Sequence, residues 1–168
     1  MWLISDARND ARLERVLARL PRGSGFVFRH YHLSPAERLA RWRELQRTAR
    51  RFGHCAVFAG TMAEARRYRA DGAYGPPKRL ARGDAGLRLI TAHSLRELAQ
   101  ARRACADAVL LSPVFATNSH PGAPSLGPVR FRLLAARAGL PVIALGGMTK
   151  HRAATLAPHA WAAIDGHL

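Results

Sequence analysis

The chain has 168 residues, of which 48% are hydrophobic, and a formal net charge of +16 at pH 7. This size is typical of one globular domain with a sizeable core, and no apolar run approaches the roughly 20 residues that span a bilayer. The charge favours anionic partners such as phosphate metabolites, nucleic acid or an anionic membrane face. Because the basic residues recur along predicted helices rather than in one tail, we interpret most of them as solvated helix faces.

The first residues and the cysteines bear on the compartment. Residues Met1 to Asp6 lack the basic flank and long apolar region of a secretory signal peptide and are expected to form a strand. Cys55 and Cys105 lie in or beside apolar segments, a usage typical of a reduced cytosolic protein. Two isolated cysteines also provide too few ligands for a metal site. We therefore expect a cytoplasmic protein.

Short apolar strands alternate with helical segments along the chain, which predicts a parallel sheet. One predicted helix shows the expected apolar stripe, formed by Leu39, Trp42, Leu45 and Ala49. The predicted elements are, in order, a strand over Trp2–Ser5, a helix over Asp10–Leu20, a strand over Phe26–His32, a helix over Pro35–Phe52, a strand over His54–Ala59, a helix over Met62–Ala70, strands over Gly72–Tyr74 and Leu87–Thr91, a helix over Leu95–Ala104, a strand over Asp107–Phe115, a helix over Val129–Ala138, a strand over Pro141–Leu145, a helix over Lys150–Ala157 and a strand over Trp161–Ile164.

Eight predicted strands indicate a closed (β/α)8 TIM barrel, compact beside the usual ~250 residues, and a single domain over residues 1–168. We expect the helix after strand four to be reduced, because Gly75-Pro76-Pro77 opens a segment that reads as a loop or short turn. We expect the helix after strand eight to be absent, and a second copy of the chain would be a natural cover for that side. The alternative fold is an open doubly wound sheet.

Three of the predicted helices begin with the same signature. Ser34 with Glu37, Thr61 with Glu64, and Ser94 with Glu97 have the spacing of a capping box, in which a hydroxyl and a glutamate satisfy unpaired N–H groups reciprocally. Each follows a predicted strand, so the three together support the βα alternation.

The segment from Ser112 to Gly127 is the most informative stretch. It follows an apolar strand, is long and proline-stiffened, and carries hydroxyls and a histidine, as functional loops do. Function in a barrel lies at the C-terminal ends of the strands. Polar or glycine residues at those ends are Arg29, His30, Tyr31, His32, Gly60, Thr61, Thr91, His93, Thr117, Asn118, Ser119, His120, Asp165 and Gly166. The histidines show no recognised zinc spacing and are candidates for general acid–base roles.

Gly146 and Gly147 end the seventh predicted strand and precede a helix. Glycines there let backbone N–H groups approach a phosphate, and barrels often bind phosphate after strands seven and eight. We therefore predict a phosphate site at this pair.

These motifs resemble the thiamine phosphate synthase / TenI family over nearly the whole chain. The matching residues are Ser112-Pro113-Val114-Phe115 with Thr117, Ser119, His120, Ala123 and Leu126-Gly127, then Leu145-Gly146-Gly147-Met148-Thr149, Thr91-Ala92-His93-Ser94 and Arg29. Members of the family are (β/α)8 barrels. The synthases join a pyrimidine diphosphate to a thiazole phosphate with Mg²⁺ and release diphosphate, whereas TenI-type relatives aromatise the thiazole phosphate.

The resemblance implies a role for each matching residue. It places Thr117 and Ser119, with Asn118 between them, against phosphate groups, Gly146 and Gly147 at the thiazole phosphate, and Thr91 at the diphosphate substrate. Arg29 and His120, the latter in place of a lysine, would stabilise the diphosphate, and Asp165 and Gly166 stand where the family has Val-Ser at the end of strand eight.

Several departures from the family pattern cluster in the pyrimidine and metal half. Val27 and Tyr31 replace a glutamine and a lysine, and Ala59-Gly60 replaces an Asn-Asp pair. Arg79 aligns near the second magnesium aspartate. Because Mg²⁺ prefers carboxylate ligands, we expect no standard magnesium site and no resident cofactor.

The sequence therefore favours a thiamine phosphate synthase-like transferase of thiamine biosynthesis that acts on small phosphorylated metabolites. The alternative is a divergent TenI-like member, either tautomerase-type or non-catalytic, that binds a phosphorylated small molecule without the standard magnesium site. Nucleic-acid binding driven by charge comes last, because no recognised motif accompanies the charge, and we expect no membrane partner.

Overall fold

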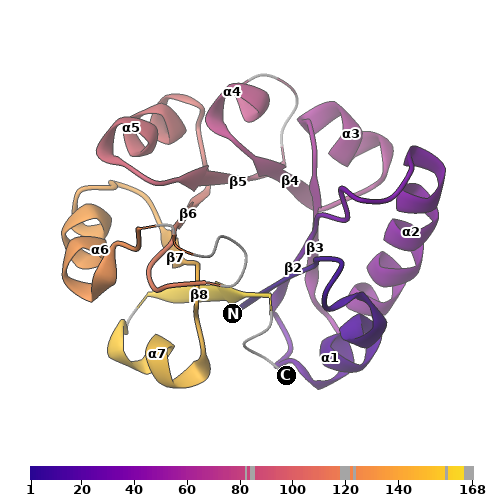
Figure 1. Ribbon diagram of the computed structural model, residues 1–168. Coiled ribbons are helices and arrows are strands. Elements are labelled where there is room, and N and C mark those ends of the chain that lie inside the picture. Colours follow the sequence, from indigo (N-terminus) through magenta and orange to yellow (C-terminus); the bar gives the residue numbers. More distant parts are fainter. Residues whose placement is uncertain (82, 84–85, 118–121, 123, 158, 165–168) are drawn as a thin grey trace.

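The structure is a computed structural model that describes residues 1–81, 83, 86–117, 122, 124–157 and 159–164. Eight parallel strands pair in sequence order, and the last pairs with the first, so the sheet closes into a barrel with helices around it (Figure 1). The predicted TIM barrel is thus confirmed. The strands are β1 (Trp2–Ile4), β2 (Gly25–Phe28), β3 (Cys55–Ala59), β4 (Gly72–Gly75), β5 (Leu87–Ala92), β6 (Ala108–Leu111), β7 (Val142–Ala144) and β8 (Ala160–Ala163).

Helices connect the strands on the outside of the barrel. They are the 3-10 turn η1 (Asp10–Arg12) and the helices α1 (Leu13–Arg19), α2 (Pro35–Arg51), α3 (Met62–Arg67), α4 (Pro77–Leu80), α5 (Leu95–Arg103), α6 (Gly127–Ala136) and α7 (Lys150–Thr155). The helix after strand four is reduced, as expected, to the four residues of α4. Residues 165–168, which follow β8, lie outside the described part, and a covering second copy stays a prediction. None of the helices in the described residues is long and apolar enough to cross a membrane.

Two predicted strands are too long. β2 ends at Phe28 rather than His32, because His30 has a φ of 31° and turns the chain out of the sheet. β6 ends at Leu111 rather than Phe115, where Ser112 and Pro113 begin the long loop. In both cases apolar or aromatic residues continue the strand pattern past the point where the backbone leaves the ladder.

Alternate side chains of each strand face the two sides of the sheet. One cluster of buried residues fills the barrel interior and includes Ile4, Val27, Val57, Leu89 and Leu110. The residues between them pack outward against the helices, where Trp42 of α2 is fully buried. Because apolar side chains fill the interior, the barrel has a packed core rather than a channel, and a functional site would lie at its rim.

Two of the three predicted capping boxes are complete, those of Ser34 with Glu37 and Thr61 with Glu64. The third is only half formed. Ser94 accepts the N–H of Glu97, but the Glu97 carboxylate accepts the N–H of His93 instead of that of Ser94. The departure ties the residue after β5 to the start of α5.

Asn9 closes the barrel at the mouth. Its side-chain amide donates to the carbonyl oxygens of Ile4 at 3.0 Å and Ile164 at 2.9 Å, and thereby joins the ends of β1 and β8. The Asn9 side chain is buried. Water therefore cannot take over its hydrogen bonds, and the junction of β1 with β8 depends on this amide.

Candidate functional site

The candidate site lies at the C-terminal mouth of the barrel, where alternation places specific side chains over the interior. Thr91 has the same parity as the interior residue Leu89 and so faces the barrel axis. Arg29 follows the last residue of β2 and continues the parity of Val27, and its positive charge acts on the interior Tyr74 phenol. Tyr74 of β4 belongs to the interior cluster, and burial raises the pKa of its phenol to about 12. The mouth is therefore floored by a neutral phenol and bordered by a cation and a hydroxyl.

The loop after β6 is fastened to the end of β7. The Val114 N–H donates to the Leu145 carbonyl at 2.9 Å, and the Phe115 N–H donates to the Gly146 carbonyl at 3.0 Å. The far end of the loop returns to the same place, since the Leu126 N–H donates to the Pro113 carbonyl at 2.8 Å. These bonds hold the segment that carries Thr117 against the glycine pair.

Gly146 and Gly147 are required by this contact. Their φ angles are 96° and 61°, in the region that side chains rarely adopt. A Cβ at Gly146 would lie 2.7 Å from Cα of Pro113, and one at Gly147 would lie 2.3 Å from the carbonyl oxygen of Ala116. The N–H groups of the two glycines have no hydrogen-bond acceptor among the described residues, which leaves them able to bind an anion.

The structure brings Thr117, Gly146 and Gly147 to one side of the mouth and Arg29 to another, on the β2 side. Thr91 ends between them on β5. The other predicted site residues, Asn118, Ser119, His120, Asp165 and Gly166, lie outside the described part of the chain.

His93 occupies a defined position between β5 and β6. Its Nδ1–H donates to the carbonyl oxygen of Ser112 at 2.7 Å. Since a carbonyl can only accept, the neutral ring must carry its proton on Nδ1, which leaves Nε2 as a base. The residue is exposed at the mouth and is thus available for proton transfer.

His30 has a structural position instead. It is 1% exposed, with Nδ1 2.7 Å from the Ser5 hydroxyl and Nε2 2.8 Å from the Asp10 carboxylate. Burial lowers its pKa, although Asp10 opposes the shift. Neutral His30 donates to Asp10 and accepts from Ser5, whose oxygen accepts the Arg29 N–H at 2.8 Å. The network fixes the backbone of Arg29.

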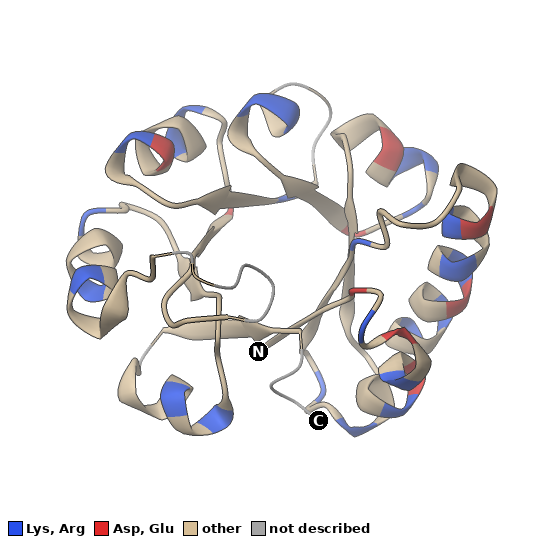
Figure 2. Cartoon of the chain, viewed as in Figure 1, with Lys and Arg blue, Asp and Glu red and all other residues tan. Residues whose placement is uncertain are grey.

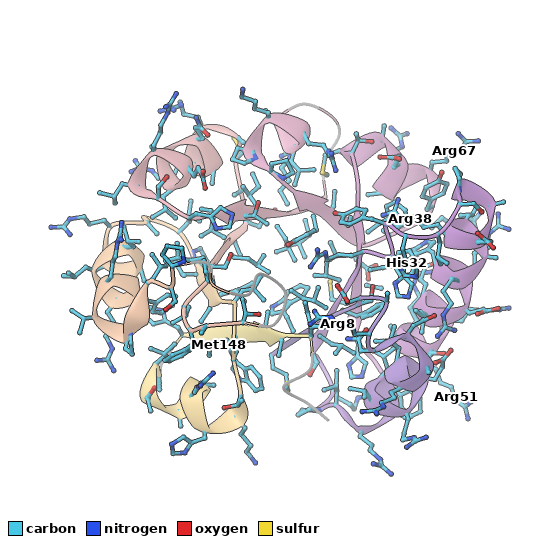
Figure 3. The ribbon with its side chains drawn as sticks, viewed as in Figure 1. Arg8, His32, Arg38, Arg51, Arg67 and Met148 are labelled. Carbon is cyan, nitrogen blue, oxygen red and sulfur yellow. The ribbon has the colours of Figure 1, made fainter. Side chains whose placement is uncertain are left out.

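Arg38 of α2 is a rim residue that the sequence analysis missed. Most arginines lie on the outer helices (Figure 2), and Arg43, Arg47 and Arg51 of α2 are exposed there. Arg38 is partly buried, and its guanidinium donates to the carbonyl oxygens of Arg29 at 3.0 Å and Ala59 at 2.6 Å. Figure 3 places Arg38 and His32 across the barrel from Met148. The available signal was its place in the first turn of the helix, next to the strand ends.

The residues at the family's metal positions do not fit Mg²⁺. Gly60 offers no side-chain ligand, and a Cβ there would lie 2.7 Å from Oε2 of Glu64. Arg79 is itself a cation, whereas Mg²⁺ binds through carboxylates and phosphates. No group of three or more His, Cys, Asp or Glu side chains that could hold a metal is found in the described part of the chain.

Comparison with known proteins gives consistent matches. A family model described as thiamine monophosphate synthase matches residues 1–164. A thiamine-phosphate synthase of Chloroflexus aurantiacus is 31% identical over 165 residues, which cover 92% of this chain and 76% of the relative. A putative thiamine-phosphate synthase 2 of Aquifex aeolicus is 41% identical over 60 residues, but the match covers only 36% of this chain and 32% of that protein.

Solved structures show the same fold. A thiamine phosphate pyrophosphorylase from Pyrococcus furiosus superposes with a TM-score of 0.81 at 20% identity and covers 97% of this chain and 84% of the other. One from Bacteroides thetaiotaomicron gives 0.65 at 12% identity and covers 98% and 82%. With the family model extending from the first strand of the barrel to the end of the last, the chain belongs to the thiamine monophosphate synthase family.

Proposed function

We propose that the chain is a thiamine phosphate synthase-type transferase that joins a pyrimidine diphosphate to a thiazole phosphate and releases diphosphate. The observation that carries the proposal is the contact of the β6 loop, up to Ala116 next to Thr117, with Gly146 and Gly147, whose backbone N–H groups have no acceptor among the described residues. This arrangement suits the phosphate of a monoester. Family membership supports the reaction.

The proposed chemistry is an ionisation followed by capture. The carbon–oxygen bond between the pyrimidine substrate and its diphosphate breaks, and its electron pair leaves with the diphosphate. The lone pair of the thiazole nitrogen then forms the new carbon–nitrogen bond. The chain's contribution is to stabilise the negative charge that develops on the leaving group.

Arg29 and Thr91 are the described residues that we assign to this stabilisation, because Arg29 follows β2 and Thr91 lies near the end of β5, so both are at the C-terminal mouth, with β3 and β4 between them. Thr117 would hold the phosphate of the acceptor. Asn118, Ser119, His120, Asp165 and Gly166 are proposed to complete the two phosphate sites, on the strength of the resemblance. Since the residues at the metal positions do not fit Mg²⁺, no step is assigned to a metal.

The test is formation of thiamine phosphate from the two substrates, measured chromatographically with EDTA and with added Mg²⁺. We expect product above background and at least a tenfold loss of rate in Arg29→Gln. Arg51→Gln removes the same charge from the exposed far end of α2 and should leave the rate within twofold. Absence of product under both conditions would refute the proposal.

The geometry of His93 favours a second candidate, a TenI-like role in which the thiazole phosphate is bound and aromatised. Aromatisation moves a proton within the substrate, and a ring whose Nδ1–H is fixed on the Ser112 carbonyl has a free base at Nε2. Conversion of the non-aromatic thiazole phosphate, followed by its absorbance, should be lost in His93→Gln. Binding of thiazole phosphate without either reaction would indicate a non-catalytic member.

A further inference from the structure

Three arginines gather at the rim above β2, β3 and β4. The guanidinium carbons of Arg29 and Arg38 lie 5.6 Å and 5.3 Å from the centre of the same Tyr31 ring. Arg79 is a residue of α4, and the aliphatic part of its side chain lies against Gly75. A Cβ on Gly75 would be 3.5 Å from Cδ of Arg79 and 3.8 Å from the carbonyl oxygen of Gly60. Arg29, Arg38 and Arg79 are called the rim arginines below.

Arg38 is held by neutral groups rather than by carboxylates. Arg38 stacks on Phe58 at 4.3 Å, and the acceptors of its hydrogen bonds are two backbone carbonyls. Two of its five N–H groups are used in this way, and among the described residues we find no acceptor for the other three. None of the described carboxylates forms an ion pair with a rim arginine. In the described part of the chain, then, none of the three charges is matched by a carboxylate in direct contact.

The carboxylates that influence this rim already have partners. Glu64 accepts hydrogen bonds from the Thr61 N–H and hydroxyl, at 2.7 Å and 2.9 Å. Asp6 is bonded to the Arg8 guanidinium at 2.8 Å. Burial opposes a low pKa at Asp6, but the hydrogen bonds and charge of Arg8, with a smaller contribution from Arg29, lower it. Burial lowers the pKa of Arg38, and the positive charge of Arg79 acts in the same direction. Bringing several cations together costs free energy, and a bound polyanion would remove that cost.

We propose that the rim arginines form a diphosphate site that needs no divalent metal, in which guanidinium groups supply the positive charge that a metal ion would otherwise bring. Guanidinium groups bind phosphate oxygens in pairs and stay protonated. The proposal rests on the proposed function for the identity of the anion, and it adds Arg38 and Arg79 to the residues that would bind it. Relative to the family pattern, Gly60 and Arg79 each replace a carboxylate that would bind Mg²⁺. A site that holds diphosphate with guanidinium groups instead of a metal would account for both replacements.

The test is calorimetric titration of the whole chain with inorganic diphosphate, once in EDTA and once with excess Mg²⁺. We expect binding in EDTA and no gain in affinity with Mg²⁺. Arg79→Gln should weaken binding about tenfold, because it removes one of three cations. Arg79 is exposed, so the substitution should leave the fold intact. Arg51→Gln, the matched control at the same ionic strength, should bind within twofold of the native chain.

Two results would overturn the proposal. One is diphosphate binding that appears only with Mg²⁺, and the other is equal weakening by Arg79→Gln and Arg51→Gln, which would indicate non-specific attraction to a basic protein. The outcome of this test is separate from the outcome of the thiamine phosphate assay. Metal-free binding without product supports the diphosphate site and refutes the transferase, whereas turnover that depends strictly on Mg²⁺ does the reverse.

Discussion

Replacement of Gly147 by alanine tests the β6–β7 contact on which the phosphate site depends. The residue has a φ of 61°, and alanine in this left-handed conformation costs about 1–2 kcal/mol. The new Cβ would also lie 2.3 Å from the carbonyl oxygen of Ala116 and 2.9 Å from Cβ of Phe115. Such distances are far below van der Waals contact, so the loop must move away from the end of β7.

The second contribution comes from the bonds that hold the loop. Moving it displaces the Val114–Leu145 and Phe115–Gly146 hydrogen bonds, each worth about 0.5–1.5 kcal/mol. Together with the backbone cost, Gly147→Ala should lower the free energy of unfolding by about 2–5 kcal/mol.

Equilibrium unfolding in urea measures the loss, and Gly139→Ala is its control. Gly139 has a φ of 64°, but the nearest atom to a Cβ there is Nε of Arg102 at 3.6 Å, so only the backbone cost of about 1–2 kcal/mol applies. The two variants should differ by about 1–3 kcal/mol, the share of the loop bonds. A difference below about 0.5 kcal/mol would show that the loop yields freely, and the reasoning would be wrong.

Three further predictions concern stability. Burial holds the pKa of His30 below its ordinary value, so on acidification the unfolded chain takes up a proton that the folded chain does not, and the free energy of unfolding falls below about pH 6.5 by up to about 1.4 kcal/mol per pH unit. The difference between the urea midpoints at pH 7.5 and pH 5.5 should therefore be smaller in His30→Gln than in the native chain. An equal difference in the two proteins would contradict this. Asn9→Ala removes the side-chain donor from the carbonyls of Ile4, which is buried, and Ile164, which is partly buried. It should cost about 1–3 kcal/mol by urea unfolding, and a loss under about 0.5 kcal/mol would contradict a role of Asn9 in joining β1 to β8. Thr61→Ala removes the cap of α3 and should lower stability by about 1 kcal/mol, whereas Thr61→Ser should keep most of it; equal losses in the two variants would rule out the hydroxyl as the cause.

Much of the fold could be predicted because its signals are local. Each apolar strand, and each helix start such as those at Ser34 and Thr61, can be recognised from a few neighbouring residues. The repeated alternation of strand and helix predicts a parallel sheet with outer helices. The glycine pair was likewise found from its place between a strand and a helix. Its necessity came only from the structure, since it depends on Pro113 and Ala116, which lie more than thirty residues away in the chain.

The sequence by itself thus determined the order of the elements, the barrel class and the glycine pair, because these follow from hydrophobic period, capping residues and backbone freedom. The tertiary structure alone decided what each polar side chain does. His30 and Arg29 are adjacent in sequence, yet the turn at His30 buries one against Ser5 and leaves the other facing the mouth. Arg38 looks like any arginine of a helix face until barrel closure brings Arg29, Ala59 and Phe58 around it. Which charges share a rim depends on distances across the sheet, and a linear pattern does not contain those distances.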